Sequence, residues 1–137
     1  MKRFFLILLS CFCLMPSCSR TPESIVYWVW GIPVCLKDHH IEQFQDLQLP
    51  NGDVETEIKM RVDLSEKDID KLIRKGAQPL PIPDSFQDKD WIEEKSEMSE
   101  LEHGVFYYEP GRMAPHECKI LVYDKDSQML YYYLSIM

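Results

Sequence analysis

Two groups of histidine and carboxylate side chains are the first residues in this sequence that suggest chemistry. His39, His40 and Glu42 lie close together, and His116 with Glu117 forms a second, smaller group. Imidazole and carboxylate groups bind zinc, which can activate water for hydrolysis. However, adjacent histidines on a strand point to opposite faces, and the chain has no HExxH or CxxC spacing. We therefore predict solvated loop histidines, with no metal and no other cofactor.

Two cysteines are the next candidates for chemistry. Of the five in the chain, Cys35 and Cys118 lie far from the N-terminus. In an oxidising compartment they would form a disulfide, which would bring the two histidine groups closer together; two separate buried thiols are the alternative. The serines have no GxSxG context, and no glycine-rich phosphate loop occurs. We therefore expect no catalytic residues and a protein that is not an enzyme.

Acidic side chains concentrate between residues 84 and 102. Such a segment offers a docking surface for a basic protein, whose approach the negative charge would accelerate. A solvated face without a partner is the alternative. The candidate residues for a protein-binding surface are Glu93, Glu94, Glu97, Glu100 and Glu102.

The N-terminus has the order of an export signal. Lys2 and Arg3 precede a mostly apolar run that ends at Met15, and Pro16 and small residues follow. The run covers about a dozen residues, whereas a helix that spans a bilayer needs roughly 20. We therefore predict a signal peptide that is removed rather than a permanent membrane helix.

Residues 14–18, with the sequence LMPSC, resemble the lipobox of bacterial lipoproteins. The resemblance implies cleavage after Ser17 and acylation of Cys18, which becomes the first residue of the mature chain. In that family an aspartate after the cysteine favours the inner membrane, so Ser19 implies the outer membrane, facing the periplasm. The residues that depart from the usual pattern are Met15 and Pro16. Secretion to the periplasm with cleavage after Ser19 is the alternative.

Removal of residues 1–17 leaves an acidic chain of one-domain size. It has 13 basic and 23 acidic residues, a formal charge of −10 with histidine neutral. This charge argues against nucleic acids and against adsorption to anionic lipid. We predict the lipidated cysteine and a short tether at 18–24, and a single globular domain at 25–137. Membrane contact is then expected through the lipid anchor only.

Strand patterns must position most of these groups. Residues 25–30 are β-branched and aromatic, and residues 54–64 alternate between apolar and polar, so both segments predict strands. Further strands are predicted at 105–108, 118–123 and 128–136, with a turn at 124–127. Residues 36–49 fit either a short helix or a strand. The apolar residues behind the helical alternative are Ile41, Phe44 and Leu47.

The clearest helix signal begins at Ser65. Ser65 and Asp68 have the spacing of a capping box, and Gly76 is expected to end the helix. The predicted buried stripe consists of Ile69, Leu72 and Ile73. Residues 78–84 contain three prolines and are expected to be extended and irregular.

These patterns together predict an α+β fold, with a small antiparallel sheet of about four or five strands and one or two packed helices. Small size, acidity, a lipid tether and the lack of catalytic motifs favour an exported lipoprotein of the bacterial envelope. We expect it to bind a protein partner without catalysis, as inhibitors and immunity proteins do. The alternatives are a structural accessory of an envelope complex and a secreted metal-dependent hydrolase.

Overall fold

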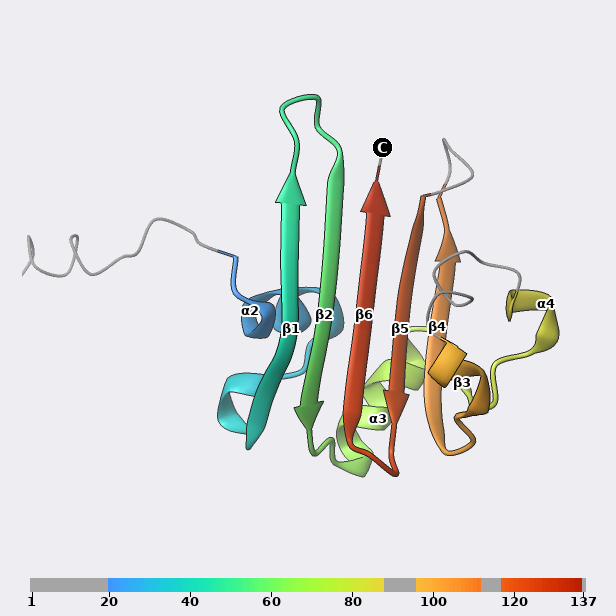
Figure 1. Cartoon of the computed structure of the whole chain (residues 1–137). Coiled ribbons are helices and arrows are strands. Elements are labelled where there is room, and N and C mark those ends of the chain that lie inside the picture. Colours follow the sequence, from blue (N-terminus) through green and yellow to red (C-terminus); the bar gives the residue numbers. More distant parts are fainter. Residues whose placement is uncertain (1–19, 88–95, 112–116, 137) are drawn as a thin grey trace, which may run out of the picture.

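The computed structural model describes residues 20–87, 96–111 and 117–136 (Figure 1). The described residues form one antiparallel sheet of six strands in the order β1-β2-β6-β5-β4-β3. In chain order the elements are α2 (Pro22–Trp30), the 3₁₀ helix η1 (Val34–Leu36), β1 (His39–Gln48), β2 (Val54–Val62), α3 (Glu66–Arg74), β3 (Gln78–Pro79), α4 (Asp84–Gln87), the 3₁₀ helix η2 (Ser96–Glu100), β4 (Gly104–Pro110), β5 (Cys118–Asp124) and β6 (Met129–Ile136). The predicted α+β class is confirmed, but the sheet has more strands than predicted.

The two edges of the sheet hold strands that the sequence left uncertain or missed. β1 pairs with β2 along its length at one edge, and the two-residue β3 pairs with β4 at the other. Pro79 is compatible with β3 because an edge strand need not donate every backbone N–H. The start of the proline-rich segment is therefore a short strand rather than irregular chain.

The sheet buries side chains on both faces. α2 and α3 cover one face, behind the sheet in Figure 1, and enclose the larger core, which includes Trp30 and Tyr132. The other face packs a smaller core against η2, whose Met98 is buried there. Tyr131 and Tyr133 pack against this smaller core, on the face opposite Tyr132, as the alternation of side chains along a strand requires.

The prediction of a strand at residues 25–30 is wrong, because these residues belong to α2. The Thr21 hydroxyl accepts a hydrogen bond from the Ser24 backbone N–H at 3.1 Å, and the Thr21 N–H donates to the Ser24 hydroxyl at 3.0 Å. Pro22 occupies the first helical position, and Gly31 ends the helix at a φ of +74°. Start and stop signals at the helix ends thus outweigh the β propensity between them.

The ambiguous segment before residue 49 resolves in favour of the strand alternative. In β1, Ile41 pairs with Met60 and Phe44 pairs with Ile58, with the register shifted by the extra residue Glu42. This β-bulge places Ile41 and Phe44 on the same face although they are three positions apart. The bulge therefore produces a spacing that resembles one face of a helix.

The capping box of α3 is confirmed. The Ser65 hydroxyl accepts from the Asp68 N–H at 3.2 Å, and the Asp68 carboxylate accepts from the Ser65 N–H at 3.1 Å. Ile69 and Leu72 are buried as predicted, whereas Ile73 is 46% exposed. The buried stripe is therefore narrower than the sequence suggested.

Gly76 and Gly104 are among the glycines that hold backbone conformations which other residues rarely adopt. Gly76 follows α3 at a φ of +111°, as predicted for the residue that ends the helix. Gly104 begins β4 at a φ of +143°, and a Cβ atom there would lie 1.9 Å from the carbonyl oxygen of Tyr123. Only glycine fits at the start of this strand.

The hairpin between β5 and β6 has the predicted turn. The Asp124 carboxylate accepts hydrogen bonds from the backbone N–H of Asp126 at 3.3 Å and of Ser127 at 3.2 Å. The Ser127 hydroxyl also donates to it at 2.6 Å. The aspartate side chain thus organises the turn residues that follow it.

Candidate functional site

The predicted acidic surface lies partly outside the described residues. Glu93 and Glu94 are outside them, and Glu97 belongs to η2. Glu100 and Glu102 are exposed at and just after the end of η2. The acidic docking surface therefore stays a prediction, with two described carboxylates exposed to solvent.

The predicted disulfide between Cys35 and Cys118 is not formed in this structure, in which both are free thiols. Cys118 begins β5, where it pairs with Ser135 near one end of the sheet. Cys35 lies in η1, just before the start of β1 at the opposite end (Figure 1). The strand directions therefore separate the two sulfurs. Cys18, the predicted lipid attachment site, lies outside the described residues.

His39 joins the start of β1 to α2. Its Nδ1 lies 2.9 Å from the Lys37 carbonyl oxygen and its Nε2 lies 3.1 Å from Glu23 Oε1. The hydrogen bond to Lys37 and the Glu23 carboxylate raise the pKa of His39, against the effect of burial. In the protonated ring, both nitrogens can donate to these two oxygens.

The metal-binding hypothesis gains no support from this geometry. His40 is exposed, and His116 lies outside the described residues. Among the residues that the structure describes, no group of three or more histidine, cysteine or acidic side chains could hold a metal ion. His39 is instead used in the contact between β1 and α2.

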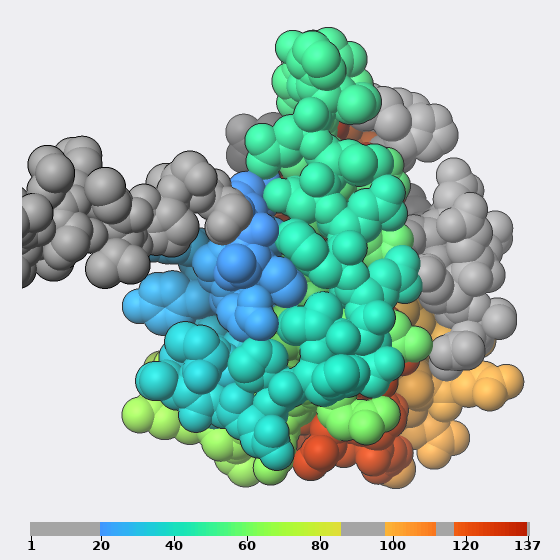
Figure 2. Space-filling model, turned by 60° about the vertical axis from the view of Figure 1, so that its left-hand side comes forward, coloured from blue at the N-terminus to red at the C-terminus, as the bar shows by residue number. Residues whose placement is uncertain are grey.

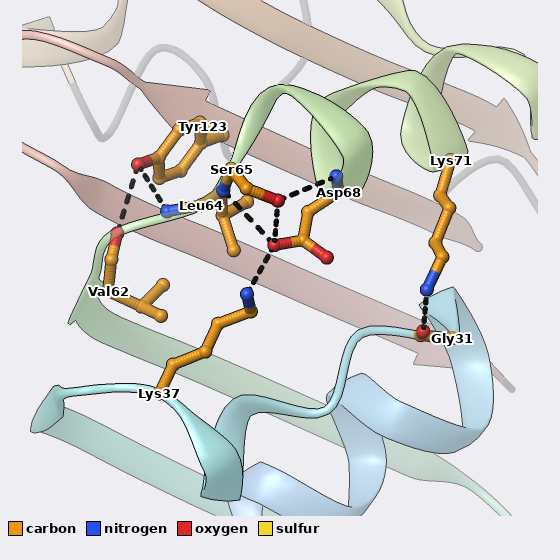
Figure 3. Close-up of polar contacts among 8 residues, drawn as sticks. All are labelled: Gly31, Lys37, Val62, Leu64, Ser65, Asp68, Lys71 and Tyr123. Atoms are coloured by element: carbon orange, nitrogen blue, oxygen red, sulfur yellow. Dashed lines mark hydrogen bonds and ion pairs between the residues drawn. The ribbon is translucent and has the colours of Figure 1, made fainter.

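A polar network connects α3 to the segment before β1 (Figure 3). Asp68 forms an ion pair with Lys37 and accepts from the hydroxyl of Ser65 at 2.9 Å. Burial alone would raise the pKa of Asp68, but the hydrogen bonds from Lys37 and Ser65 hold it below its ordinary value. The carboxylate is therefore charged, and its contacts with Ser65 and Lys37 stabilise the start of α3.

Three further hydrogen bonds, made by Tyr123 and Lys71, extend this network. The Tyr123 hydroxyl donates to the Val62 carbonyl at 3.0 Å and accepts from the Leu64 N–H at 3.1 Å. The Lys71 ammonium donates to the carbonyl of Gly31 at 3.4 Å, which links α3 to the end of α2 (Figure 3). The network fixes both helices relative to the sheet.

The outer edge of β1 is a candidate binding surface that the sequence did not reveal. β1 is terminal in the strand order, so among the described strands its outer backbone edge has no neighbour. Phe44 and Leu47 of this strand are exposed, on opposite faces of the sheet, and Leu49 follows them. Figure 2 shows this edge facing the viewer, with α2 beside it. We call it the β1 edge.

The outer side of α2 is a second exposed apolar surface. The rings of Tyr27 and Trp28 lie edge to face with centroids 5.8 Å apart, and Trp28 is 81% exposed. We call these two residues the aromatic pair. The sequence could have indicated this apolar surface, because residues 24–36 contain no charged side chain.

A cavity of about 340 Å³ lies between α2 and the ends of β4, β5 and β6. Its lining includes Val29, Lys119, Tyr132 and Leu134, so it is largely apolar. The Tyr132 hydroxyl is buried, and among the described residues it has no hydrogen-bond partner; burial raises the pKa of Tyr132 to about 12. The cavity has the size of a small-molecule site.

Comparison with known proteins assigns no family, since no protein-family model, curated protein or solved structure matches the chain. Within the described residues, none of the helices combines the length and apolar character required to cross a membrane. The candidate sites therefore depend on their own geometry and chemistry.

Proposed function

We propose that this chain is an exported lipoprotein, tethered through Cys18, that acts as a non-catalytic binding protein in the bacterial envelope. Its predicted place is the outer membrane, facing the periplasm, and its predicted partner is another protein. Inhibitors and immunity proteins belong to this functional class. The leader sequence supports the tether, and the β1 edge supports the binding role.

The β1 edge is the observation on which the binding role depends. β1 has ten residues, and nearly all of its side chains are at least partly exposed. An outer strand presents unpaired backbone groups that can pair with a strand of another protein. The bulge at Glu42 interrupts the regular ladder, so the segment from Gln43 to Gln48 is the part suited to added pairing.

The side chains of the β1 edge add specificity to this backbone surface. Phe44 and Leu47 lie on opposite faces, so a partner strand would place its own side chains against both. Charges flank them, since Asp46 pairs with Arg20 at 3.6 Å and Glu42 pairs with Arg61 at 3.8 Å. Apolar contacts between charged groups are typical of a selective protein interface.

The tether is tested by mass spectrometry of the mature protein from a bacterial host that processes lipoproteins. The expected N-terminal peptide begins at Cys18 and carries the mass of acyl chains. A chain that begins at Arg20 would indicate secretion without an anchor, and an intact Met1 would exclude export.

The binding role is tested by photo-crosslinking in envelope extracts of the native host. A photoreactive amino acid replaces Leu47 in one variant and Ile73 in a matched control, since these residues are 43% and 46% exposed on different elements. We expect one protein to be crosslinked from position 47 and not from position 73. The adduct should disappear when Phe44→Glu is added, because a charge replaces an apolar contact.

The outcome separates the functional classes. An adduct with a single protein supports the proposal, and adducts with several subunits of one membrane complex would instead favour the structural accessory. Equal adducts from both positions, or none from position 47, would contradict binding through the β1 edge. Thermal unfolding of each variant checks that the fold is intact.

A further inference from the structure

The aromatic pair on α2 has an unusual setting. The inner side of α2 buries Ile25, Val26 and Trp30 in the larger core, whereas Tyr27 and Trp28 face outward. The outer side of a helix on a soluble domain usually carries charged or polar residues. A tryptophan that is 81% exposed beside an exposed tyrosine therefore indicates a surface that meets something other than water.

The surroundings of the aromatic pair are uncharged along the chain. Residues 24–36 contain no acidic or basic side chain, although 28% of the whole sequence is charged. Leu36, the last residue of η1, is 83% exposed. In Figure 2, α2 and the segment that leads to β1 lie together on one side of the molecule. The acidic domain thus has an uncharged stretch of chain with three exposed apolar or aromatic side chains close to its N-terminal segment.

The chain length places this region close to the predicted anchor. Only residues 19 and 20 separate Cys18 from Thr21, the cap of α2. Three extended residues span at most about 11 Å. Trp28 lies seven positions after Thr21, a rise of about 10 Å along a helix. The aromatic pair is therefore within roughly 20 Å of the predicted acylated cysteine.

We infer that the aromatic pair contacts the lipid headgroup region of the membrane that holds the Cys18 anchor. This inference depends on the lipid tether of the proposed function and extends it, because the anchor alone was expected to touch the membrane. Tyrosine and tryptophan favour the membrane interface, where the ring meets apolar groups and the polar atom stays hydrated. Residues 24–36 carry no acidic side chain, so this stretch adds nothing to the repulsion that a domain of formal charge −10 meets at anionic lipid.

The contact fixes how the domain sits on the membrane. In this orientation α2 lies between the bilayer and the sheet. The β1 edge lies beside α2 rather than beneath it (Figure 2), so it stays accessible to a protein partner. One short helix thereby orients the binding surface.

The test uses the full acylated chain in vesicles of phosphatidylethanolamine and phosphatidylglycerol. Some vesicles contain lipids brominated near the headgroup, which quench nearby tryptophan fluorescence. We expect quenching of the wild-type protein and loss of at least half of it in Trp28→Phe. The matched control Ile73→Ala, at an exposed position of α3, should retain the quenching. Mass spectrometry of the same samples measures acylation at Cys18.

Each outcome bears on the inference. Quenching that is absent from acylated protein, or unchanged in Trp28→Phe, overturns the membrane contact and leaves the tether intact. A chain without acyl groups overturns both the tether and the contact. If a protein partner shields Trp28 from solvent and brominated lipid does not quench it, the aromatic pair belongs to a protein interface. That result would likewise overturn the inference.

Discussion

α2 and α3 cover the same face of the sheet, yet their outer surfaces differ. Each has nine residues and begins with a capping box, from Thr21 and Ser24 in one and from Ser65 and Asp68 in the other. Outside its buried stripe α3 carries mostly charged residues, as expected where a helix meets water. The outer side of α2 carries the aromatic pair. The same local rules therefore build both helices, and the outer residues decide what each one contacts.

The two helices also differ in how polar groups beneath them are paired. At the start of α3, the Tyr123 hydroxyl has two hydrogen bonds, and Asp68 has an ion pair. Beneath α2, the buried Tyr132 hydroxyl and the Trp30 indole N–H have no partner among the described residues. The buried polar groups are therefore paired beneath α3, whereas beneath α2 the Trp30 and Tyr132 rings contribute through aromatic packing.

The largest expected difference in stability is between substitutions on the buried side of α2 and on its exposed side. Trp30→Ala removes a ring that packs edge to face on Tyr107 and Tyr132, with centroids 5.0 and 6.1 Å away. We expect the free energy of unfolding to fall by about 3–5 kcal/mol. Trp28→Ala should change it by less than about 0.5 kcal/mol, because the side chain is exposed. Urea unfolding followed by circular dichroism measures both, and similar losses would mean that the outer side is equally packed.

A smaller difference is expected between the two capping boxes. Asp68→Ala removes the N3 carboxylate of the α3 capping box and leaves the Lys37 ammonium without its carboxylate, so we expect a loss of about 2–3 kcal/mol. Ser24→Ala removes the corresponding residue of α2 and should cost about 0.5–1 kcal/mol. Urea unfolding of both variants tests the ranking. Adding Lys37→Met to Asp68→Ala should recover part of the loss; no recovery would show that the ion pair contributes little.

The two buried tyrosines should respond differently to loss of the hydroxyl. Tyr123→Phe leaves the Leu64 N–H and the Val62 carbonyl without that partner, and we expect a loss of about 1–2 kcal/mol. Tyr132→Phe removes a hydroxyl that has no partner among the described residues, and stability should be unchanged or slightly higher. Thermal unfolding of the pair measures this. A large loss in Tyr132→Phe would indicate a bound water or ligand in the adjoining cavity.

The smallest effect concerns pH and the contact between α2 and β1. The pKa of His39 is raised from 6.5 in the folded state, so its stabilising contribution is complete below that value. The contribution is lost as the pH rises through the raised folded-state pKa. Stability measured at about pH 5.5 should therefore exceed that at about pH 8.5 by more in the wild type than in His39→Gln. His40→Gln, at the exposed neighbouring position, is the matched control.

The elements that were predicted correctly carry a complete local signal. β2 alternates without interruption, and α3 has a cap, a buried stripe and a terminal glycine that all agree. The misassigned α2 has such signals too, in Thr21, Pro22 and Ser24, but β-branched and aromatic residues between them favoured a strand. Its aromatic content reflects what the helix contacts rather than its backbone conformation.

The features of the fold and of the candidate sites that were not predicted depend on spatial information that a single sequence lacks. The bulge at Glu42 changes the phase of β1, and only pairing with β2 reveals it. The exposure of Leu47 and Trp28 depends on which strand is outermost and on which side of α2 meets the sheet. The disulfide between Cys35 and Cys118 was inferred from the number of cysteines and the predicted oxidising compartment. The strand directions instead place the two residues toward opposite ends of the sheet.

Gly104 is a position whose residue type is set by contact with the backbone and not by the surface of the domain. Because a side chain there would collide with the backbone of the neighbouring strand, saturation mutagenesis should return glycine alone at this position. The exposed residues of α2 and β1 are under no comparable steric constraint. Alignment of distant homologues should therefore begin from the glycine that opens the fourth strand.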